Sequence, residues 1–288
     1  MRTASNRLSK WLRWPAEAAL TLALGLAAAA ALVRCAPGFG ADERALDHRL
    51  SQAAAESLRQ PPQESYWSTL ARLARLDFGV AQVGEMPIGE LLAARLPITA
   101  LTAGAGALLG WLLAVTLGCL AASGSAGILL RWSATVLSTL PPAVLALAAL
   151  LKSAGPSPAA LAAAVVALAV AARLLLNVLQ LIQAQRRMHY LRLAQARGVH
   201  GLGLILRHLA LPLFPLWLAL LANAFSLGLA AAVPVEVICG APGLGQLAWL
   251  GAQQRDINLV AAVALAMLAA NYLLSSTAAC FAEHGDRR

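Results

Sequence analysis

Long apolar segments alternate with short polar ones along most of the chain, and this alternation predicts six membrane-spanning helices. Each segment is close to the ~20 apolar residues that a helix needs to cross a bilayer. The predicted spans are residues 15–34, 97–122, 128–151, 157–182, 205–234 and 257–281. An even number of spans places both chain ends on the same side of the membrane. The sequence therefore predicts an all-α integral membrane protein, with five of the spans grouped in a core over 97–282.

The third and fourth predicted spans are the least regular pair. Pro141-Pro142 interrupts the third span, and only residues 152–156 separate it from the fourth. Proline is tolerated inside a membrane helix where neighbouring helices or cavity water satisfy the freed carbonyl groups.

The first span has an alternative interpretation, because it follows the basic stretch 1–14 and so resembles a secretory signal peptide. Leu32-Val33-Arg34-Cys35 is also similar to a lipoprotein cleavage site. However, Arg34 stands where a small residue is expected, and the apolar stretch exceeds the about 7–15 residues of a signal peptide core. We therefore expect an uncleaved signal anchor.

The composition agrees with a membrane protein. Of the 288 residues, 60% are hydrophobic and 12% are charged, whereas soluble domains carry about 25% charged residues. The net charge of +9 does not indicate nucleic acid, because the basic residues are concentrated in two short segments. Residues 1–14 and 181–208 carry four and five basic residues and no acid, whereas 35–95 carries six basic and eight acidic residues.

This asymmetry predicts the orientation, because basic loops stay on the cytoplasmic side. The N-terminus (1–14), the loop 181–208 and the C-terminus (283–288) are then cytoplasmic, and the segments 35–96 and 235–256 are external. Within the basic loop, residues 189–212 are long enough to form a short helix of their own. They include an Ala-x-Ala-x-Gly run from Ala194 to Gly198.

No motif in the chain predicts catalysis or a bound nucleotide. The glycine-rich stretch Gly240-Ala-Pro-Gly-Leu-Gly245 lacks the Lys-Ser/Thr of a phosphate-binding loop. We interpret its Gly240, Pro242, Gly243 and Gly245 as a turn whose glycines permit positive φ and tight packing against a neighbouring span. The four scattered cysteines have no metal-ligand spacing and are expected to act as small apolar residues. We therefore expect no cofactor or metal on this chain.

Several polar residues in or beside the spans allow two interpretations. Arg173 lies in the fourth span, where it either lines a functional path or extends to the cytoplasmic surface. Asn223, Ser226 and Asn271 either line a translocation path or hydrogen-bond between helices, and the second role is the more frequent.

Glu236 and Asp256 flank the glycine-rich turn. We expect them to be solvated or paired loop charges, because Arg255 is adjacent to Asp256.

Four blocks of the sequence together resemble one family. They are Ala36-Pro37-Gly38, Arg72–Thr102, Tyr190–His208 and Val233–Val260. In order and in position between spans, they are similar to the permease subunits of bacterial binding-protein-dependent ABC importers, in the dipeptide, oligopeptide and nickel branch. The second and fourth blocks resemble the segments that precede the second and the last spans of that branch.

The resemblance implies a function for the basic loop. Tyr190–His208 looks like the cytoplasmic coupling helix that docks on an ATPase subunit, whereas its alternative role is only to set the topology. The residues expected to contact the ATPase are Tyr190, Arg192, Ala194, Ala196, Arg197, Gly198 and His208. Where the importer loop usually begins Glu-Ala-Ala, this chain has Arg192 and Leu193, as is common in the peptide branch.

The resemblance also implies the partners. A second, similar permease would share the pathway, and two cytosolic ATPase subunits would carry ATP and magnesium. A periplasmic or extracytoplasmic binding protein would deliver the solute, most simply a peptide or nickel, across the bacterial inner membrane. The position four residues after Asn271, where the family leads us to expect an acid, is Ser275.

Two other classes of function remain open. An ion-gradient-driven transporter usually shows internal repeats and acidic residues at the membrane midplane, and no acid lies in the middle of any predicted span here. A scaffold or receptor without transport is the other alternative.

Overall fold

The computed structural model describes most of the apolar core and little of the N-terminal third. The described residues are 19–21, 23–28, 31, 71, 75, 77–81, 84, 86–122, 127–152, 157–186, 188–198, 213–254 and 256–285. They fall into two compact units, which are treated separately below. Unit 1 comprises Met1–Ala94 and Leu247–Ala269, and unit 2 comprises Arg95–Gln246 and Ala270–Arg288.

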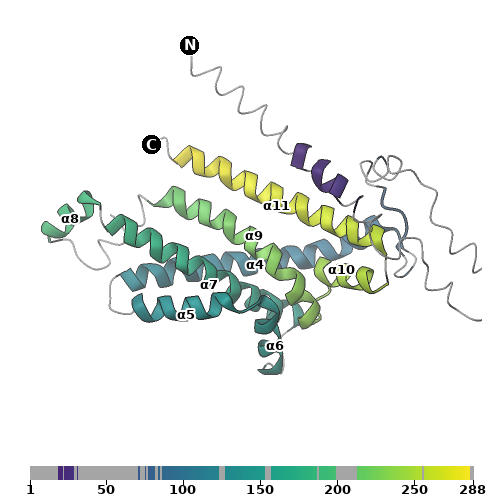
Figure 1. The fold of residues 1–288 in the computed structure, drawn as a ribbon, viewed down its shortest axis with the longest axis horizontal. Coiled ribbons are helices and arrows are strands. Elements are labelled where there is room, and N and C mark those ends of the chain that lie inside the picture. Colours follow the sequence, from purple (N-terminus) through teal and green to yellow (C-terminus); the bar gives the residue numbers. More distant parts are fainter. Residues whose placement is uncertain are drawn as a thin grey trace, which may run out of the picture. The chain divides into compact units, whose positions relative to one another are not determined.

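The described part of the chain is almost entirely helical, so the protein is an all-α membrane protein. The helices are α4 (Ile88–Ala122), α5 (Gly127–Thr139), α6 (Pro142–Lys152), α7 (Pro158–Arg186), α8 (His189–Ala196), α9 (Phe214–Cys239), α10 (Leu244–Gln253) and α11 (Ile257–Gly285) (Figure 1). Of these, α4, α7, α9 and α11 are each long and apolar enough to cross a membrane, and α5 with α6 adds a fifth crossing if the pair is one span. The first predicted span, 15–34, is described only as a shorter apolar helix, Ala19–Ala28.

The helices differ from the predicted spans mainly at their ends. Helix α4 begins at Ile88, nine residues before the predicted start of the second span, directly after Pro87. Helix α9 continues five residues beyond the predicted end of its span, to Cys239. The predicted external segment 235–256 also contains a helix of its own, α10.

Helices α4 and α7 of unit 2 pack with almost no side chain between them. One face of α4 repeats a small residue at every fourth position, through Gly106, Gly110, Ala114 and Gly118. A Cβ on Gly110 would lie 2.7 Å from the carbonyl oxygen of Ala167. One on Gly118 would overlap the Val178 side chain. Small residues let two membrane helices approach closely, so this face of α4 specifies the position of α7.

The same contacts establish the direction of each helix. Gly106 meets Val166 and Gly118 meets Val178, so α4 and α7 run parallel. Gly228 of α9 meets Ala103 and Ala107 of α4. Trp111 near the middle of α4 donates its indole N–H to the carbonyl oxygen of Trp217 near the start of α9, at 3.0 Å. Helix α9 is therefore antiparallel to α4.

Because α4 and α7 are parallel, the chain between them must cross the membrane once. That crossing is made by α5 and α6, which meet at an angle of 98°. The third predicted span therefore exists as one crossing, but it is not a straight helix. The break falls between Leu140 and Pro142, since proline removes a backbone donor and clashes with the preceding turn.

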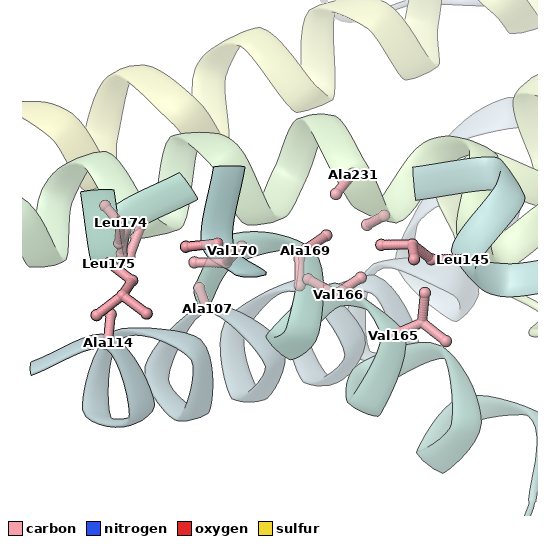
Figure 2. Packing of buried hydrophobic residues seen from close by; sticks show 14 of the residues in the cluster. Ala107, Ala114, Leu145, Val165, Val166, Ala169, Val170, Leu174, Leu175 and Ala231 are labelled. Atoms are coloured by element: carbon pink, nitrogen blue, oxygen red, sulfur yellow. The ribbon is translucent and has the colours of Figure 1, made fainter. Parts of the chain in front are cut away.

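The hydrophobic core of unit 2 lies between α4, α7 and α9, with α5 and α6 packed against it. Figure 2 shows Ala107 and Ala114 of α4 beneath Val170 and Leu174 of α7. Ala107, Leu174 and Val170 are at most 1% exposed. Small residues on one helix facing branched residues on the next produce a thin, dense layer.

Within unit 1, the chain forms a tight turn just before α4. Val80 pairs with Pro87 in an isolated antiparallel bridge, and the Ala81 N–H donates to the Met86 carbonyl at 2.9 Å. Gly79 has φ +76° and precedes the bridge. This turn fixes the direction in which α4 begins.

Candidate functional site

A buried carboxyl group lies near the C-terminal end of α9, beside Thr99 and Thr102 of α4. The side chain of Glu236 is 0% exposed. Thr102 of α4 donates a hydrogen bond to Glu236 Oε1 at 2.6 Å, and Thr99 donates to Oε2 at 3.2 Å. The backbone N–H of Gly245, in the first turn of α10, also donates to Oε2 at 2.8 Å. Three donors from two other segments therefore converge on one carboxyl group.

Thr99 connects this network to the glycine-rich turn. Its hydroxyl accepts a hydrogen bond from the Leu244 N–H at 2.7 Å while it donates to Glu236. Burying a carboxyl group costs free energy unless its oxygens are hydrogen-bonded. The network therefore joins α4, α9 and the start of α10 into one rigid corner, which we call the carboxyl lock (Thr99, Thr102, Glu236, Leu244 and Gly245).

The glycine-rich turn has the geometry predicted for it. Gly240 ends α9 with φ 69°, and the Ala241 N–H donates to the Glu236 carbonyl at 2.9 Å. Gly243 contacts the Glu236 carboxyl so closely that a Cβ there would overlap it, and a Cβ on Gly245 would lie 2.7 Å from Val233. The positive φ and the tight packing against a membrane helix are confirmed. The remaining predicted turn residue, Pro242, is exposed.

The prediction for Glu236 and Asp256 was a solvated or paired loop charge, and the solvated alternative is wrong because both side chains are buried. Glu236 lies inside α9 because that helix extends further than its apolar stretch, and the threonines that bond it come from a distant part of the sequence. Asp256, in unit 1, is 4% exposed and accepts a hydrogen bond from the Leu259 N–H at 3.0 Å. It caps the N-terminus of α11, where a carboxylate satisfies a free backbone donor.

At the other end of the bundle, the predicted coupling segment contains the short helix α8. Only Arg187 and Met188 separate it from α7, and it projects beyond the C-terminal end of α7 (Figure 1). Gly198 follows it with φ +80°. The predicted helix in the basic loop is therefore confirmed over His189–Ala196.

The residues of α8 divide into exposed and buried positions. Tyr190 is 39% and Leu193 57% exposed, and Arg197 and Gly198 are also exposed. Ala194 is only 6% exposed, so it packs against its own chain, and its contact with an ATPase stays a prediction. Among the other predicted coupling residues, Arg192 and Ala196 are part of α8, and His208 lies outside the described residues.

The predicted path residues lie on three helices, α7, α9 and α11. Ser226 of α9 is hydrogen-bonded to Ser275 of α11, with 3.2 Å between the hydroxyl oxygens, which confirms the interhelical role for Ser226. The Oδ1 atom of Asn271 is buried and has no hydrogen-bond partner in the described structure. Asn223 is exposed on α9, and Arg173 is half-buried on α7.

Sequence reasoning missed the threonines of the carboxyl lock. Thr99 and Thr102 stand three residues apart in an otherwise apolar stretch, which places both hydroxyls on one face of a helix. That spacing was the signal in the sequence that could have identified them.

Cys119 and Cys239, which we expected to be small apolar residues, are free thiols in the helix packing, half-buried and buried respectively.

Comparison with known proteins gave one family. Residues 106–288 match the model of the family described as binding-protein-dependent transport system inner membrane component. This match covers the chain from the glycine face of α4 through α11. None of the curated proteins that were searched matches the chain.

Proposed function

The chain belongs to the family of binding-protein-dependent transport system inner membrane components, and from this premise we propose how it works and what it carries. Membership makes it a multi-pass permease component of an ABC importer, with a solute-binding protein and an ATPase as partners. We propose that it moves a small solute by alternating access, most simply a di- or oligopeptide and otherwise nickel. A second, similar permease would complete the pathway, and two ATPase subunits would bind ATP and magnesium.

Helix α8 is the observation that carries this proposal. It presents Tyr190 and Leu193 outward, Arg197 is exposed directly after it, and only two residues separate it from α7. An aromatic, an aliphatic and an arginine side chain on and beside one projecting helix have the chemistry of a protein-binding surface. A partner that pushes on α8 would therefore move α7 directly, and α4 with it, because their backbones are in contact. A rigid-body displacement of this kind can change which side of the membrane the path faces.

The orientation of the protein follows from the same helix. The basic loop that contains α8 is then cytoplasmic, and both chain ends lie on that side. The carboxyl lock and the glycine-rich turn lie at the opposite end of α9, about 37 Å away along 26 residues of helix. That end faces the solute-binding protein.

A charge in α8 tests the proposal. We expect Leu193→Asp to lower co-purification of the ATPase by at least about tenfold, because a buried unpaired charge at an interface costs more than ~1.4 kcal/mol. Met86→Asp is the matched control, since Met86 is 45% exposed and lies before α4, in the segment 35–96 that is predicted to be external. It should leave ATPase binding unchanged.

Uptake by intact cells separates the alternatives. Solute uptake that persists when the proton gradient is collapsed with ATP maintained supports an ATP-driven importer. Uptake that stops under this condition identifies an ion-gradient-driven transporter instead. If Leu193→Asp binds the ATPase as well as the unmodified chain does, α8 is not the coupling helix.

A further inference from the structure

The second half of α7 exposes a row of polar side chains inside a membrane-spanning helix. Asn177 and Gln180 are exposed, and Arg173 is half-buried. Their spacing of four and three residues places them on one face of the helix, one turn apart. We call these three residues the polar row.

The polar row begins deep in the membrane. Gly110 of α4 packs against Val170, and Gly118 packs against Val178, so Arg173 lies near the level of Ala114. That level is eight residues, about 12 Å of helix, from the end of α4 at Ala122. No charged residue occurs in α4 after Arg95. The distance exceeds the reach of an extended arginine side chain, so Arg173 does not simply extend to the surface.

The first half of α7 shows the contrasting case. Its exposed positions include Ala164 and Leu168, and Leu168 is 44% exposed. These apolar side chains suit contact with lipid. The exposed face thus changes from apolar to polar at Arg173, within a single helix.

Arg173 has no hydrogen-bond or ion-pair partner among the residues that the structure describes. Among the span side chains whose burial the structure describes, Glu90 in the first turn of α4 is the exposed carboxylate, and Glu236 is fully buried in the carboxyl lock. A charged residue that faces lipid near the bilayer centre costs about 2.5–3.5 kcal/mol on insertion scales. The polar row therefore favours water over lipid in front of it, and the charge of Arg173 favours an anion.

We propose that Arg173 is the anion-selecting residue of the translocation path, with Asn177 and Gln180 lining the same water-filled route. Its ligand is a carboxylate on the transported solute, because a guanidinium fork matches a carboxylate in a bidentate manner. An unpaired arginine repels a free divalent metal cation, so the polar row favours a carboxylate-bearing solute. This inference rests on the proposed function, because it takes α7 to line a transport path.

Thiol labelling tests the inference without knowledge of the solute. Asn177→Cys is introduced into the full chain with its four native cysteines replaced by alanine, and membrane vesicles that contain the complete transporter are used. The rates of reaction with an anionic (sulfonatoethyl) and a cationic (trimethylammonioethyl) methanethiosulfonate are each divided by the rate with a free thiol. We expect Asn177→Cys to react with both reagents and faster with the anionic one.

Replacing the arginine supplies the decisive comparison. One unit charge at ~6 Å in water changes each rate about threefold and in opposite directions, so Arg173→Gln should lower the anionic-to-cationic ratio about tenfold. Arg173→Lys keeps the charge and should keep the ratio. Leu168→Cys on the apolar face of α7 is the matched control and should react with neither reagent.

Three results would overturn the inference. Asn177→Cys that is as unreactive as Leu168→Cys would place the polar row against lipid or protein. A ratio that Arg173→Gln leaves unchanged would remove the selecting role. Loss of the second permease from purified Arg173→Gln complexes would show that Arg173 pairs with a carboxylate of that partner and not of the solute.

These results are independent of the test of α8. If Leu193→Asp retains the ATPase while the labelling ratio shifts as expected, the coupling proposal fails and the anion path stands. If Leu193→Asp loses the ATPase and Arg173→Gln leaves the labelling ratio unchanged, the coupling proposal stands and the anion path fails.

Discussion

The two ends of helix α9 show opposite designs. At its C-terminal end, Glu236 is fully buried and three hydrogen-bond donors converge on its carboxyl group. At the level of its N-terminal end, the antiparallel neighbour α7 ends and is followed by α8, which presents Tyr190 and Leu193 outward. Buried hydrogen bonds hold one end of the bundle together, and the other end carries the short exposed helix α8.

This difference indicates which end is built to move. Buried hydrogen bonds hold helices in one arrangement, because breaking them leaves unsatisfied polar groups. A short helix with few buried contacts has little intrinsic stability and takes its position from what it binds. Under the proposed function, the carboxyl lock is the fixed end of the bundle, and α8 is the end at which displacement would enter. Four mutational experiments test this contrast, from the largest expected effect to the smallest.

Removal of the buried carboxyl should destabilise the protein most. Glu236→Ala leaves the Gly245 N–H and the Thr102 hydroxyl without their acceptor and creates a cavity, at a cost of about 3 kcal/mol in the free energy of unfolding. Thermal unfolding in detergent measures the loss. Glu236→Gln should cost less, since the Thr102 hydroxyl already lies 3.2 Å from the Thr99 carbonyl and can turn toward it. Equal stability of Glu236→Ala and the unmodified chain would show that this end is not fixed by the carboxyl.

Loss of a single donor should have a smaller effect. Thr102→Val keeps the shape of the side chain and removes the 2.6 Å hydrogen bond to Glu236, which should cost about 2 kcal/mol. Thr116→Val on the same helix is the control, because the Thr116 hydroxyl is exposed and bonds only to carbonyls of its own helix. We expect the control to change the unfolding free energy by less than ~0.5 kcal/mol. Similar losses for both variants would contradict a special role for Thr102.

Two glycines with positive φ allow the same substitution to be compared at the two ends of the bundle. Gly240 (φ 69°) ends α9 beside the carboxyl lock, and Gly198 (φ 80°) follows α8, and neither would place a new Cβ within 4 Å of another atom. Alanine at either position therefore adds only backbone strain of about 1 kcal/mol. Gly240→Ala should lower the global unfolding temperature. Gly198→Ala should leave that temperature unchanged and instead speed amide hydrogen exchange within α8.

The exposed face of α8 should be the most tolerant part of the molecule in stability measurements. Leu193→Ser removes an apolar side chain that is 57% exposed, so the free energy of unfolding should change by less than ~0.5 kcal/mol. The same variant should nevertheless weaken binding of the ATPase. A large loss of stability would mean that α8 is packed as tightly as the end of the bundle that contains the carboxyl lock.

The sequence was sufficient to predict the helices, and it was insufficient for their contacts. Apolar length alone located four of the long helices and the broken third span, because a bilayer requires a minimum number of apolar residues. It did not place the helix ends at Ile88 and Cys239. The first turns of α4 contain the exposed Glu90 and the half-buried Arg95, and the last turns of α9 contain Glu236, which only tertiary contacts bury. Nor could composition show that Gly106, Gly110 and Gly118 share one face with a partner helix.

The candidate sites show the same division. The short helix at Tyr190 and the turn at Gly240 follow from local residue types, and both are present. The burial of Glu236 depends on Thr102, which is 134 residues away in the chain, so local reasoning placed the carboxyl in solvent. The polar row of α7 was visible only in part, because the exposure of Asn177 depends on which faces of α7 the other helices cover.

The 98° bend between α5 and α6 changes what the lipid meets at this corner of the protein. Helix α5 has 13 residues and is therefore about 20 Å long, whereas the acyl layer of a bilayer is about 30 Å thick. The outward side chains of α5 include Leu129 and Trp132, which are 75% and 68% exposed. Acyl chains must shorten or tilt to match the short apolar surface of α5. Phospholipids with short acyl chains should therefore be enriched around this helix.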